Sequence, residues 1–414
     1  MIDACSQDSK RLLTLPEALD NIKTNISAIT DTEILPLQNA LGRVLAVDIY
    51  SPINLPFDRN AAMDGYAYAS ADSNPEQPFT LTLTGTSWAG KPFTGHLQPG
   101  QCIRIFTGAV VPLEADSVIM QEHVTAAGQN IQFPANSKPL QNIRKAGEDI
   151  QQTELLCNAG RKLSTYDIGL LAAAGVAEVK ILRQIKIAFF STGDELTSVG
   201  QPLVSGKIYD SNRYTLCGLL TDPAYQAIDL GVIPDDPQQL EQQFTQSAQS
   251  YDVIISTGGA SVGDADYVKD ILARCGNVNF WKLAIKPGKP MAFGNINGCH
   301  FFGLPGNPVA VVVTFRQLVA PALRKLSGAD DIKKIRFQAT ATSALKKAPG
   351  RQEFLRGILS QNDNAEFFVR SAGGQGSHIL SSMSRSNCFI VLPAECNGIQ
   401  AGEEVLVEPF DLFL

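Results

Sequence analysis

The chain has 414 residues, a length that predicts two to four domains rather than a single hydrophobic core. A net charge of −7 and a pI near 5.3 argue against a general nucleic-acid-binding protein. Its apolar runs are shorter than the roughly 20 residues that span a bilayer, and the N-terminus lacks the basic-then-apolar order of a signal peptide. We therefore expect a cytoplasmic protein with no membrane and no nucleic-acid partner.

The eight cysteines and four histidines follow no metal-ligand spacing. A structural zinc site is therefore not expected, and the cysteines are typical of a reducing compartment. We expect any bound metal to be a hard cation on carboxylates, such as magnesium.

The N-terminal third predicts helix, then loop, then strands. Apolar residues recur at helical spacing from Leu15 to about Ala46, and Gly42 interrupts a second short helical piece, Leu37 to Leu45. Residues 51–67 are rich in Pro, Asn, Asp and Gly and predict an ordered loop. The segments after it alternate as strands do.

Helical spacing returns at Thr165 to Ala174, and Gly175 closes this helix. A β-rich stretch is thus flanked by two α-rich pieces, which indicates an inserted domain. We predict a discontinuous α-rich domain, residues 1–48 and 147–181, and an inserted small β domain, residues 49–146.

Strands and helices alternate over residues 182–328, which predicts an α/β domain with a mostly parallel sheet. The last segment, residues 329–414, consists of short strands between polar turns and predicts a small β-barrel-like domain. The fold class is therefore a multidomain α/β plus β protein.

Within the α/β domain, Tyr251 to Leu272 reads as a buried strand, a loop of small residues and a helix that begins after Asp264. Unpaired N–H groups at such a turn can bind an anion. The alternative, that the glycines only make a tight turn, is equally compatible with this stretch by itself. The cradle would use Gly258, Gly259, Ser261 and Gly263.

Acidic residues gather at the predicted strand ends. Each of them alone is more typical of a helix cap or a turn. Together, beside an anion-binding loop, they would need a divalent cation between them and a phosphate, which favours a magnesium-assisted phosphate or pyrophosphate site. The set is Asp194, Glu195, Asp210, Asp235, Asp236, Asp264 and Asp266.

Two further turns carry possible anion contacts. Pro287-Gly288 lets Lys286 and Lys289 converge on one anion, although lysines on a solvated sheet edge are the alternative interpretation. The segment Gly303 to Pro308 precedes a helix with free N–H groups, and we include Pro305 and Pro308 in the binding set. The chain has no GxSxG, GxGxxG or P-loop motif.

At this level of detail the chain resembles the MoeA-type molybdopterin molybdenumtransferases, which are related to the E domain of gephyrin. The motifs occur in the family's order: FDRNAAMDGYA, RIFTGA, VIMQE, RKAGEDI, STGDEL, YDSN, STGGASVGDADYVK, WKLAIKPGKPMAFG, GLPGNPVA and GQGSH. Arg59 to Ala61 and Ala310 depart from the residues that are common in the family. Both departures leave the neighbouring acidic and glycine positions intact.

The resemblance implies a central MogA-like, molybdopterin-binding α/β domain and a late step of molybdenum cofactor assembly. In that step molybdenum from molybdate enters adenylylated molybdopterin, with magnesium-dependent hydrolysis of the adenylate and release of AMP. It also implies a homodimer whose cleft lies between the β domain of one subunit and the α/β domain of the other. A transient MogA-type partner is a further expectation.

Matched motif by motif, the resemblance implies a set of functional residues. The catalytic carboxylates would be Asp58, Asp149, Glu195, Asp235 and Asp266, and the last three of these would also be the metal ligands. Substrate would be bound by Thr107, Lys282, Lys286, Arg356 and Ser377, together with the cradle and turn residues above.

Two other functions are compatible with parts of the chain. A molybdopterin adenylyltransferase of the MogA type shares the glycine-loop domain but consists of little else. A non-catalytic scaffold like the gephyrin E domain would be expected to have a degenerate site, whereas the acidic and lysine positions here are intact.

Overall fold

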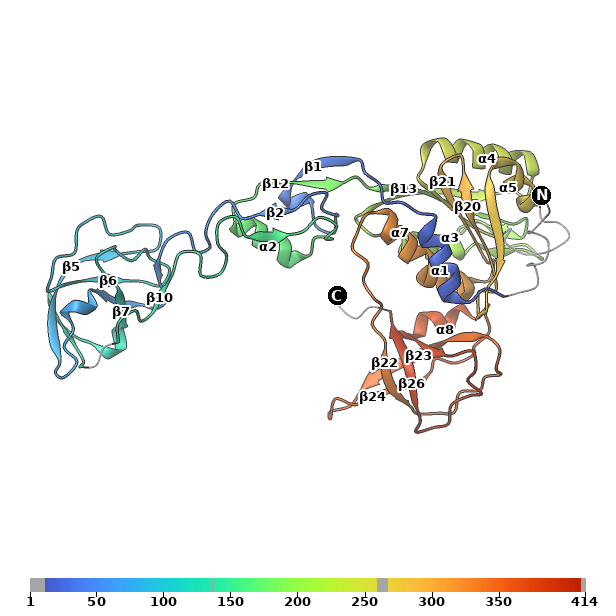
Figure 1. Ribbon diagram of the computed structural model, residues 1–414. Coiled ribbons are helices and arrows are strands. Elements are labelled where there is room, and N and C mark those ends of the chain that lie inside the picture. The colour runs from blue at the N-terminus through green and yellow to red at the C-terminus, as the bar shows by residue number, and fades with distance from the viewer. Residues whose placement is uncertain (1–11, 136–137, 259–266, 411–414) are drawn as a thin grey trace, which may run out of the picture.

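The computed structural model describes residues 12–135, 138–258 and 267–410 of the chain. The molecule is elongated (Figure 1): a β domain lies at one end, and the α/β and C-terminal domains lie together at the other. A narrow middle region with strands β1, β2 and β12 and helix α2 joins them. Among the described residues no helix has the length and apolarity needed to cross a membrane.

The first helix, α1 (Leu15–Thr24), is shorter than predicted. Thr14 caps it and forms a capping box with Glu17, and it packs on the last helix of the α/β domain. The prediction of helix as far as Ala46 is wrong. Residues Thr32–Pro36 form strand β1, which pairs antiparallel with β12 (Glu178–Leu182), and only a 3₁₀ turn, η2 (Leu37–Asn39), follows. Tertiary strand pairing overrides the weak local helical pattern here.

The middle region has its own hydrophobic cluster, which combines residues 37–45 with residues 156–181. Strand β2 (Ile49–Tyr50) pairs with β11 (Leu155–Cys157), and α2 (Thr165–Ala173) begins at a Ser164 capping box. Gly175 follows with φ of +79°, the left-handed geometry expected after a helix. The buried residues of α1 belong instead to the α/β core, so the segment predicted as 1–48 contributes to two cores.

The β domain is a six-stranded sheet in the order β7-β4-β6-β5-β9-β8. Its strands are β4 (Gly65–Tyr68), β5 (Phe79–Ser87), β6 (Gln101–Ile105), β7 (Ser117–Met120), β8 (Thr125–Ala127) and β9 (Asn130–Phe133). Two short 3₁₀ turns belong to the same domain: η3 (Ser70–Asp72) follows β4, and η4 (Gln121–His123) follows β7. Strands β3 (Asn60–Ala61) and β10 (Ile143–Arg144) pair with each other and join this domain to the middle region.

The α/β domain has the sheet order β16-β13-β17-β21-β20-β18; the first four strands are parallel, and β20 pairs antiparallel with both β21 and β18. These strands are β13 (Ile185–Thr192), β16 (Tyr225–Ile233), β17 (Val253–Thr257), β18 (Asn277–Lys282), β20 (Pro290–Ile296) and β21 (Cys299–Leu304). Every residue of β17 is buried, as expected for a central parallel strand that begins with three β-branched apolar residues.

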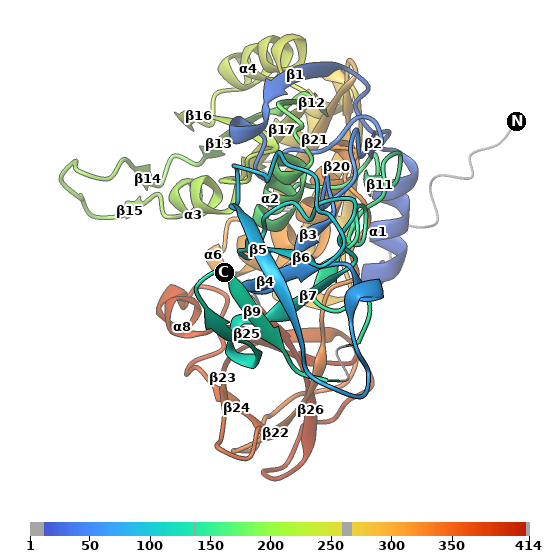
Figure 2. The same cartoon turned by 90° about the vertical axis from the view of Figure 1, so that its left-hand side faces the viewer.

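Helices cover both faces of this sheet, with separate clusters of buried side chains on its two sides. They are α3 (Asn212–Leu219), α4 (Pro237–Ser250), α5 (Tyr267–Cys275), α6 (Pro308–Thr314) and α7 (Ala320–Leu326). A π-helical turn, η5 (Phe315–Val319), links α6 to α7. It lies directly before Pro321, which has no N–H to donate to the carbonyl of residue 317. A small arm with strands β14 (Leu196–Thr197) and β15 (Ile208–Tyr209) projects beside α3 (Figure 2).

The C-terminal domain is a closed five-stranded barrel of β22 (Phe337–Ala341), β23 (Gln352–Gln361), β24 (Phe367–Ser371), β25 (Cys388–Leu392) and β26 (Glu404–Pro409), with helix α8 (Leu380–Arg385). Strand β23 pairs with both β24 and β25, which closes the ring. It also pairs with β19 (Ile285–Lys286) of the α/β domain, so a single strand joins the two domains. The multidomain α/β plus β fold is confirmed, whereas the domain boundaries stay predictions.

Candidate functional site

A cavity of about 650 Å³ opens where the parallel strands of the α/β sheet end. Its wall includes Thr192, the last residue of β13, and Gly193 directly after it, together with Asp235 after β16 and Gly258 after β17. The turn after β21, the lysine turn between β19 and β20, and two segments of the C-terminal barrel complete it. Ligands of open α/β sheets bind at this edge, because the loops that follow neighbouring strands meet there. This cavity is the candidate site.

Two of the predicted carboxylates, Glu195 and Asp235, line the cavity. The hydroxyl of Thr192 donates a hydrogen bond to one Asp235 oxygen, which fixes that side chain. The Asp235 N–H lies 3.4 Å from the carboxylate of Asp194. These bonds hold Asp235 in one orientation at the mouth of the sheet.

Other acidic residues of the predicted set have structural roles. Asp236 caps α4 by accepting the N–H of Gln239 at 2.8 Å. Asp210 is 1% exposed and accepts hydrogen bonds from Ser191 and Arg213. Within residues 12–135, 138–258 and 267–410, no group of three His, Cys, Asp or Glu side chains is placed to hold a metal. The third predicted metal ligand, Asp266, lies outside the described residues.

The described part of the glycine loop is Gly258, and its geometry requires glycine. Its φ is +87°, and a Cβ built on it would stand 2.2 Å from the carbonyl oxygen of Thr192. The backbone after β17 therefore runs directly against the end of β13. The rest of the predicted cradle, Gly259, Ser261 and Gly263, lies outside the described residues.

Of the three lysines in the predicted turn segment, two line the cavity and one does not. Lys286 lines the cavity, and its Nζ lies 3.2 Å from Glu353 Oε1 of the C-terminal barrel. Lys289 lines the cavity as well, because the turn at Gly288 (φ +111°) reverses the chain between them. Lys282 is exposed at the end of β18 and does not line the cavity, so the prediction that it joins Lys286 there is not met in this structure.

The turn after β21 contributes Pro305, Gly306 and Asn307 to the wall. The side-chain amide of Asn212 donates to the Gly306 carbonyl at 2.8 Å and holds the turn against α3. Pro308 begins α6 and does not line the cavity, although Ala310, two residues further on, does.

The C-terminal barrel supplies the remaining wall through Arg351 and the segment Gln375 to Ser377. The predicted residue Ser377 is thus in place, but Arg356 is not in the cavity: its side chain is 0% exposed and lies behind the wall. Arg351 and Gln375 were missed in the sequence. Each follows or lies within a Gly-containing turn, a signal too common to single either of them out.

The three predicted residues from the other half of the chain lie away from this cavity. Asp58 and Asp149 belong to the paired segments between the β domain and the middle region, where Asp149 N–H donates to Leu55 O at 2.9 Å. Thr107 lies in the β domain and donates from its N–H and its hydroxyl to Asp64, both at 2.8 Å. These two bonds lower the pKa of Asp64, a residue that the sequence prediction omitted. None of these three residues lines the strand-end cavity, and the β domain lies at the opposite end of the molecule from the α/β domain (Figure 1).

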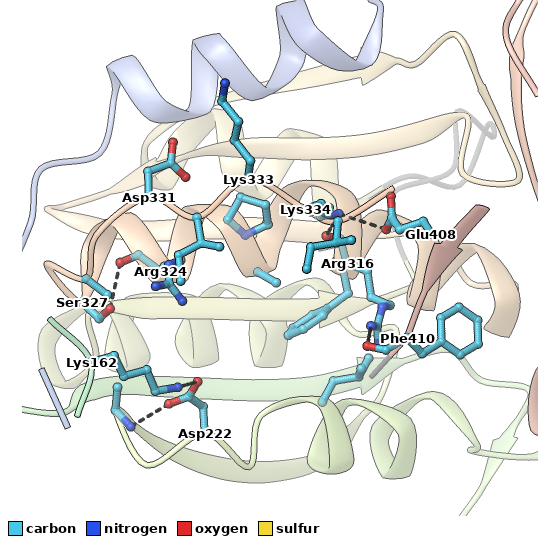
Figure 3. Close-up of a pocket in the computed structure, with 18 of the residues that line it drawn as sticks. Lys162, Asp222, Arg316, Arg324, Ser327, Asp331, Lys333, Lys334, Glu408 and Phe410 are labelled. Atoms are coloured by element: carbon cyan, nitrogen blue, oxygen red, sulfur yellow. Dashed lines mark hydrogen bonds and ion pairs between the residues drawn. The ribbon is translucent and has the colours of Figure 1, made fainter. Parts of the chain in front are cut away.

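A second cavity, of about 480 Å³, lies between α7, residues 331–335 and β26 (Figure 3). Its charged side chains are largely engaged with one another: Lys162 pairs with Asp222, and Lys334 lies 3.4 Å from Glu408. Burial lowers the pKa of Lys334 to about 8, against the opposing effect of Glu408. None of the predicted site residues that the structure describes lines this cavity.

Three family models together match most of the chain: the MoeA N-terminal region (domain I and II) at residues 13–175, a probable molybdopterin binding domain at 188–325, and the MoeA C-terminal region (domain IV) at 338–410. A molybdopterin molybdenumtransferase of Haemophilus influenzae is 46% identical over 97% of this chain and 100% of its own length. One from a Nostoc species is 36% identical over 94% of this chain and 91% of its own length.

Gephyrin of Dictyostelium discoideum is 32% identical over 94% of this chain and 60% of its own length. Among solved structures, the molybdopterin biosynthesis moeA protein of Pyrococcus horikoshii aligns with a TM-score of 0.84 and 30% identity. That alignment covers 97% of this chain and 100% of the other.

Proposed function

The chain belongs to the molybdopterin molybdenumtransferase family and is an enzyme of molybdenum cofactor biosynthesis, and from this premise we propose its reaction. It inserts molybdenum from molybdate into adenylylated molybdopterin, hydrolyses the adenylate with the help of magnesium and releases AMP. The observation that supports this proposal is the composition of the strand-end cavity. It is lined both by two carboxylates, Glu195 and Asp235, and by three basic side chains, Lys286, Lys289 and Arg351.

The cations of the cavity suit the substrates. Molybdate, a phosphate ester and a pyrophosphate are all oxyanions, and lysine and arginine bind such groups by charge-assisted hydrogen bonds. Because Lys286 and Arg351 come from different domains, an anion between them would be held at the junction of the α/β domain and the barrel.

The carboxylates suit the hydrolytic step. Water attacks the phosphorus of the adenylate, its proton passes to a carboxylate, and the bond to the departing phosphate oxygen breaks. Glu195 and Asp235 are the described carboxylates of the cavity, and Asp235 is already oriented by Thr192. The lysines would stabilise the charge that develops on the phosphate oxygens.

Magnesium fits the donors that are present. Magnesium in phosphate sites is typically held by one or two carboxylates together with substrate phosphates and water. Glu195 and Asp235 supply such oxygens, and the sequence adds Asp266 as a third candidate. When bound, the ion would withdraw charge from the phosphate oxygens and lower the pKa of a bound water.

We also propose a homodimer in which the middle region and the β domain of one subunit complete the cavity of the other. This proposal is supported by the elongated chain, whose β domain lies far from the α/β domain (Figure 1), and by the lining of the strand-end cavity, which does not include Asp58, Asp149 or Thr107. A symmetric dimer would form two equivalent composite sites. The transient MogA-type partner stays a prediction.

The test is to supply the purified protein with adenylylated molybdopterin, magnesium and molybdate and to measure AMP. We expect AMP release that depends on molybdate and that is lost in Lys286→Ala. Efficient formation of the adenylate from ATP and molybdopterin, without consumption of supplied adenylate, would overturn the proposal in favour of an adenylyltransferase. Absence of both activities would favour a scaffold.

A further inference from the structure

The wall segment Gly373–Ser377, here called the barrel loop, has no regular secondary structure yet contributes Gln375, Gly376 and Ser377 to the cavity. Three of its five residues are glycine, and Gly373 has a φ of +114°. Glycine-rich backbone has many accessible conformations, so a single loop shape needs external restraints.

Arg356 supplies those restraints from β23. Its Nη2 donates to the carbonyls of Gly374 at 3.1 Å and Gly376 at 2.9 Å. Its backbone N–H donates to Gln375 Oε1 at 2.9 Å, and its carbonyl accepts from Gln375 Nε2 at 3.1 Å. Four hydrogen bonds therefore connect this residue to three consecutive residues of the barrel loop.

The same guanidinium is anchored on its other side. Its Nε donates to Ser382 Oγ of α8 at 3.0 Å, and that hydroxyl donates in turn to the carbonyl of Ile379 at 2.7 Å. Since the planar guanidinium presents its donors in a fixed fork, the loop and α8 are held at a set distance from each other. A lysine at this position would reach fewer of these acceptors.

The charge of Arg356 is buried without a carboxylate among its hydrogen-bond partners, which are carbonyl and hydroxyl oxygens. Burial lowers its pKa to about 10, so the side chain remains protonated at neutral pH. Its Nη1 is buried and makes no hydrogen bond to any residue in the described part of the chain. Burying a cation whose partners are neutral oxygens is unfavourable for folding. The hydrogen bonds of Arg356 are therefore better explained by their effect on the shape of the cavity wall.

The barrel loop is coupled to a second wall. The carbonyl of Ser377 accepts the N–H of Val309 at 3.1 Å, which ties the loop to the first turn of α6 and to the Pro305–Asn307 turn before it. A shift of the loop would therefore displace two of the walls that line the cavity.

We propose that Arg356 is a positioning residue: it fixes the barrel loop so that Gln375, Gly376 and Ser377 meet the substrate, without contacting the substrate itself. The inference rests on the proposed function for the identity of that substrate. Displacing binding or reacting groups by even 1 Å can lower a reaction rate by roughly 100-fold. In metal sites, the residues that orient the ligands typically contribute about 10- to 100-fold to affinity or activity, and we expect a similar range here.

The experiment compares Arg356→Lys and Ser382→Ala with the unmodified protein in two readouts. The first is the kcat and KM of molybdate-dependent AMP release. The second is hydrogen exchange of peptides spanning residues 305–312 and 372–380, with residues 388–392 of the barrel as an internal control. Ser382→Ala removes one anchor of Arg356 outside the cavity and is the milder variant if Arg356→Lys does not fold.

We expect Arg356→Lys to raise KM by about 10-fold or more, with a smaller change in kcat, and Ser382→Ala to raise KM by a few-fold. Exchange should accelerate at 372–380 and 305–312 and stay unchanged at 388–392. Unchanged exchange alongside lost activity would show direct substrate contact, and unchanged kinetics in both variants would also overturn the proposal. If the unmodified protein releases no AMP, the proposed function fails, whereas the exchange readout still tests the positioning role.

Discussion

Replacing Gly258 with alanine tests how closely the glycine loop and strand β13 approach each other. The new methyl group would lie 2.2 Å from the carbonyl oxygen of Thr192, in a backbone with φ of +87°. The hydroxyl of the same Thr192 holds Asp235. The substitution therefore perturbs both the fold and a predicted catalytic carboxylate.

The magnitude follows from two terms. An L-residue in the left-handed region costs roughly 1–2 kcal/mol, and forcing a methyl group into packed backbone typically costs about 1–3 kcal/mol more. We expect Gly258→Ala to lower the free energy of unfolding of the α/β domain by roughly 2–5 kcal/mol. At a typical urea dependence of about 2 kcal/mol per molar, the unfolding midpoint falls by roughly 1–2.5 M.

The two tryptophans make this measurable. Trp281 lies in β18 of the α/β sheet, and Trp88 lies in the β domain, half exposed and stacked on Phe106. In a Trp88→Phe background, the fluorescence of Trp281 reports urea unfolding of the α/β domain alone.

Gly306→Ala is the matched control for stability, since Gly306 lies in the same cavity wall and a Cβ there meets nothing within 4 Å. We expect its midpoint to move by less than about 0.5 M. Equal midpoints for the two alanine variants would refute the close approach of Gly258 to Thr192.

Three further predictions concern charged groups. Lys286→Ala should weaken the binding of inorganic phosphate, measured by calorimetry, by about 10-fold or more, because Lys286 lines the cavity. Lys282 lies outside the cavity, so Lys282→Ala should change phosphate affinity by less than about twofold. Equal losses of affinity in the two variants would contradict the placement of Lys286. Burial lowers the pKa of His300 from 6.5, despite the opposing charge of Asp252, so the folded state resists a proton that the unfolded chain accepts. Stability should therefore fall as the pH drops below 6.5, and His300→Gln should lose less stability than the unmodified protein between pH 7 and pH 5 in urea titrations; identical losses would argue against it. Thr107→Val removes a hydroxyl bond that lowers the pKa of Asp64, so an NMR titration should show that pKa rise, and an unchanged titration would mean that the backbone N–H suffices.

Local patterns predict the parts of this fold whose stability is local or strongly apolar. The apolar run 253–255 begins a strand that is buried along its whole length, and Gly175 ends α2 as its position suggests. Local patterns do not predict the strand at residues 32–36. This segment forms a strand only by pairing with β12, which lies almost 150 residues later in the sequence. Pairing over such a separation leaves no mark in a local window.

The residues of the candidate site likewise divide into those that the sequence could place and those that depend on distant contacts. Glu195, Asp235 and Lys286 could be placed at the strand ends from their order along an alternating α/β pattern, because the topology brings those ends together. Lys282 and Arg356 could not be placed in this way. Lys282 ends β18, at the edge of the α/β sheet. Arg356 lies in β23, and whether its side chain enters the cavity or supports the wall depends on barrel packing that forms only when β23 pairs with β24 and β25.

The central claim is that molybdenum insertion takes place in a cavity completed by a second subunit, and mixed dimers test it directly. Subunits carrying Asp58→Ala and subunits carrying Asp235→Ala are produced together with different affinity tags, and dimers with one of each are purified through both tags. Each variant alone should be inactive. In a mixed dimer, one of the two composite sites keeps both residues.

We predict that the mixed dimers release AMP, in the presence of molybdate, at about half the rate of the unmodified dimer, since one of the two symmetric sites is intact. If each site instead lay within one subunit, neither site of the mixed dimer would be complete. A mixed dimer as inactive as its parents would therefore contradict the account.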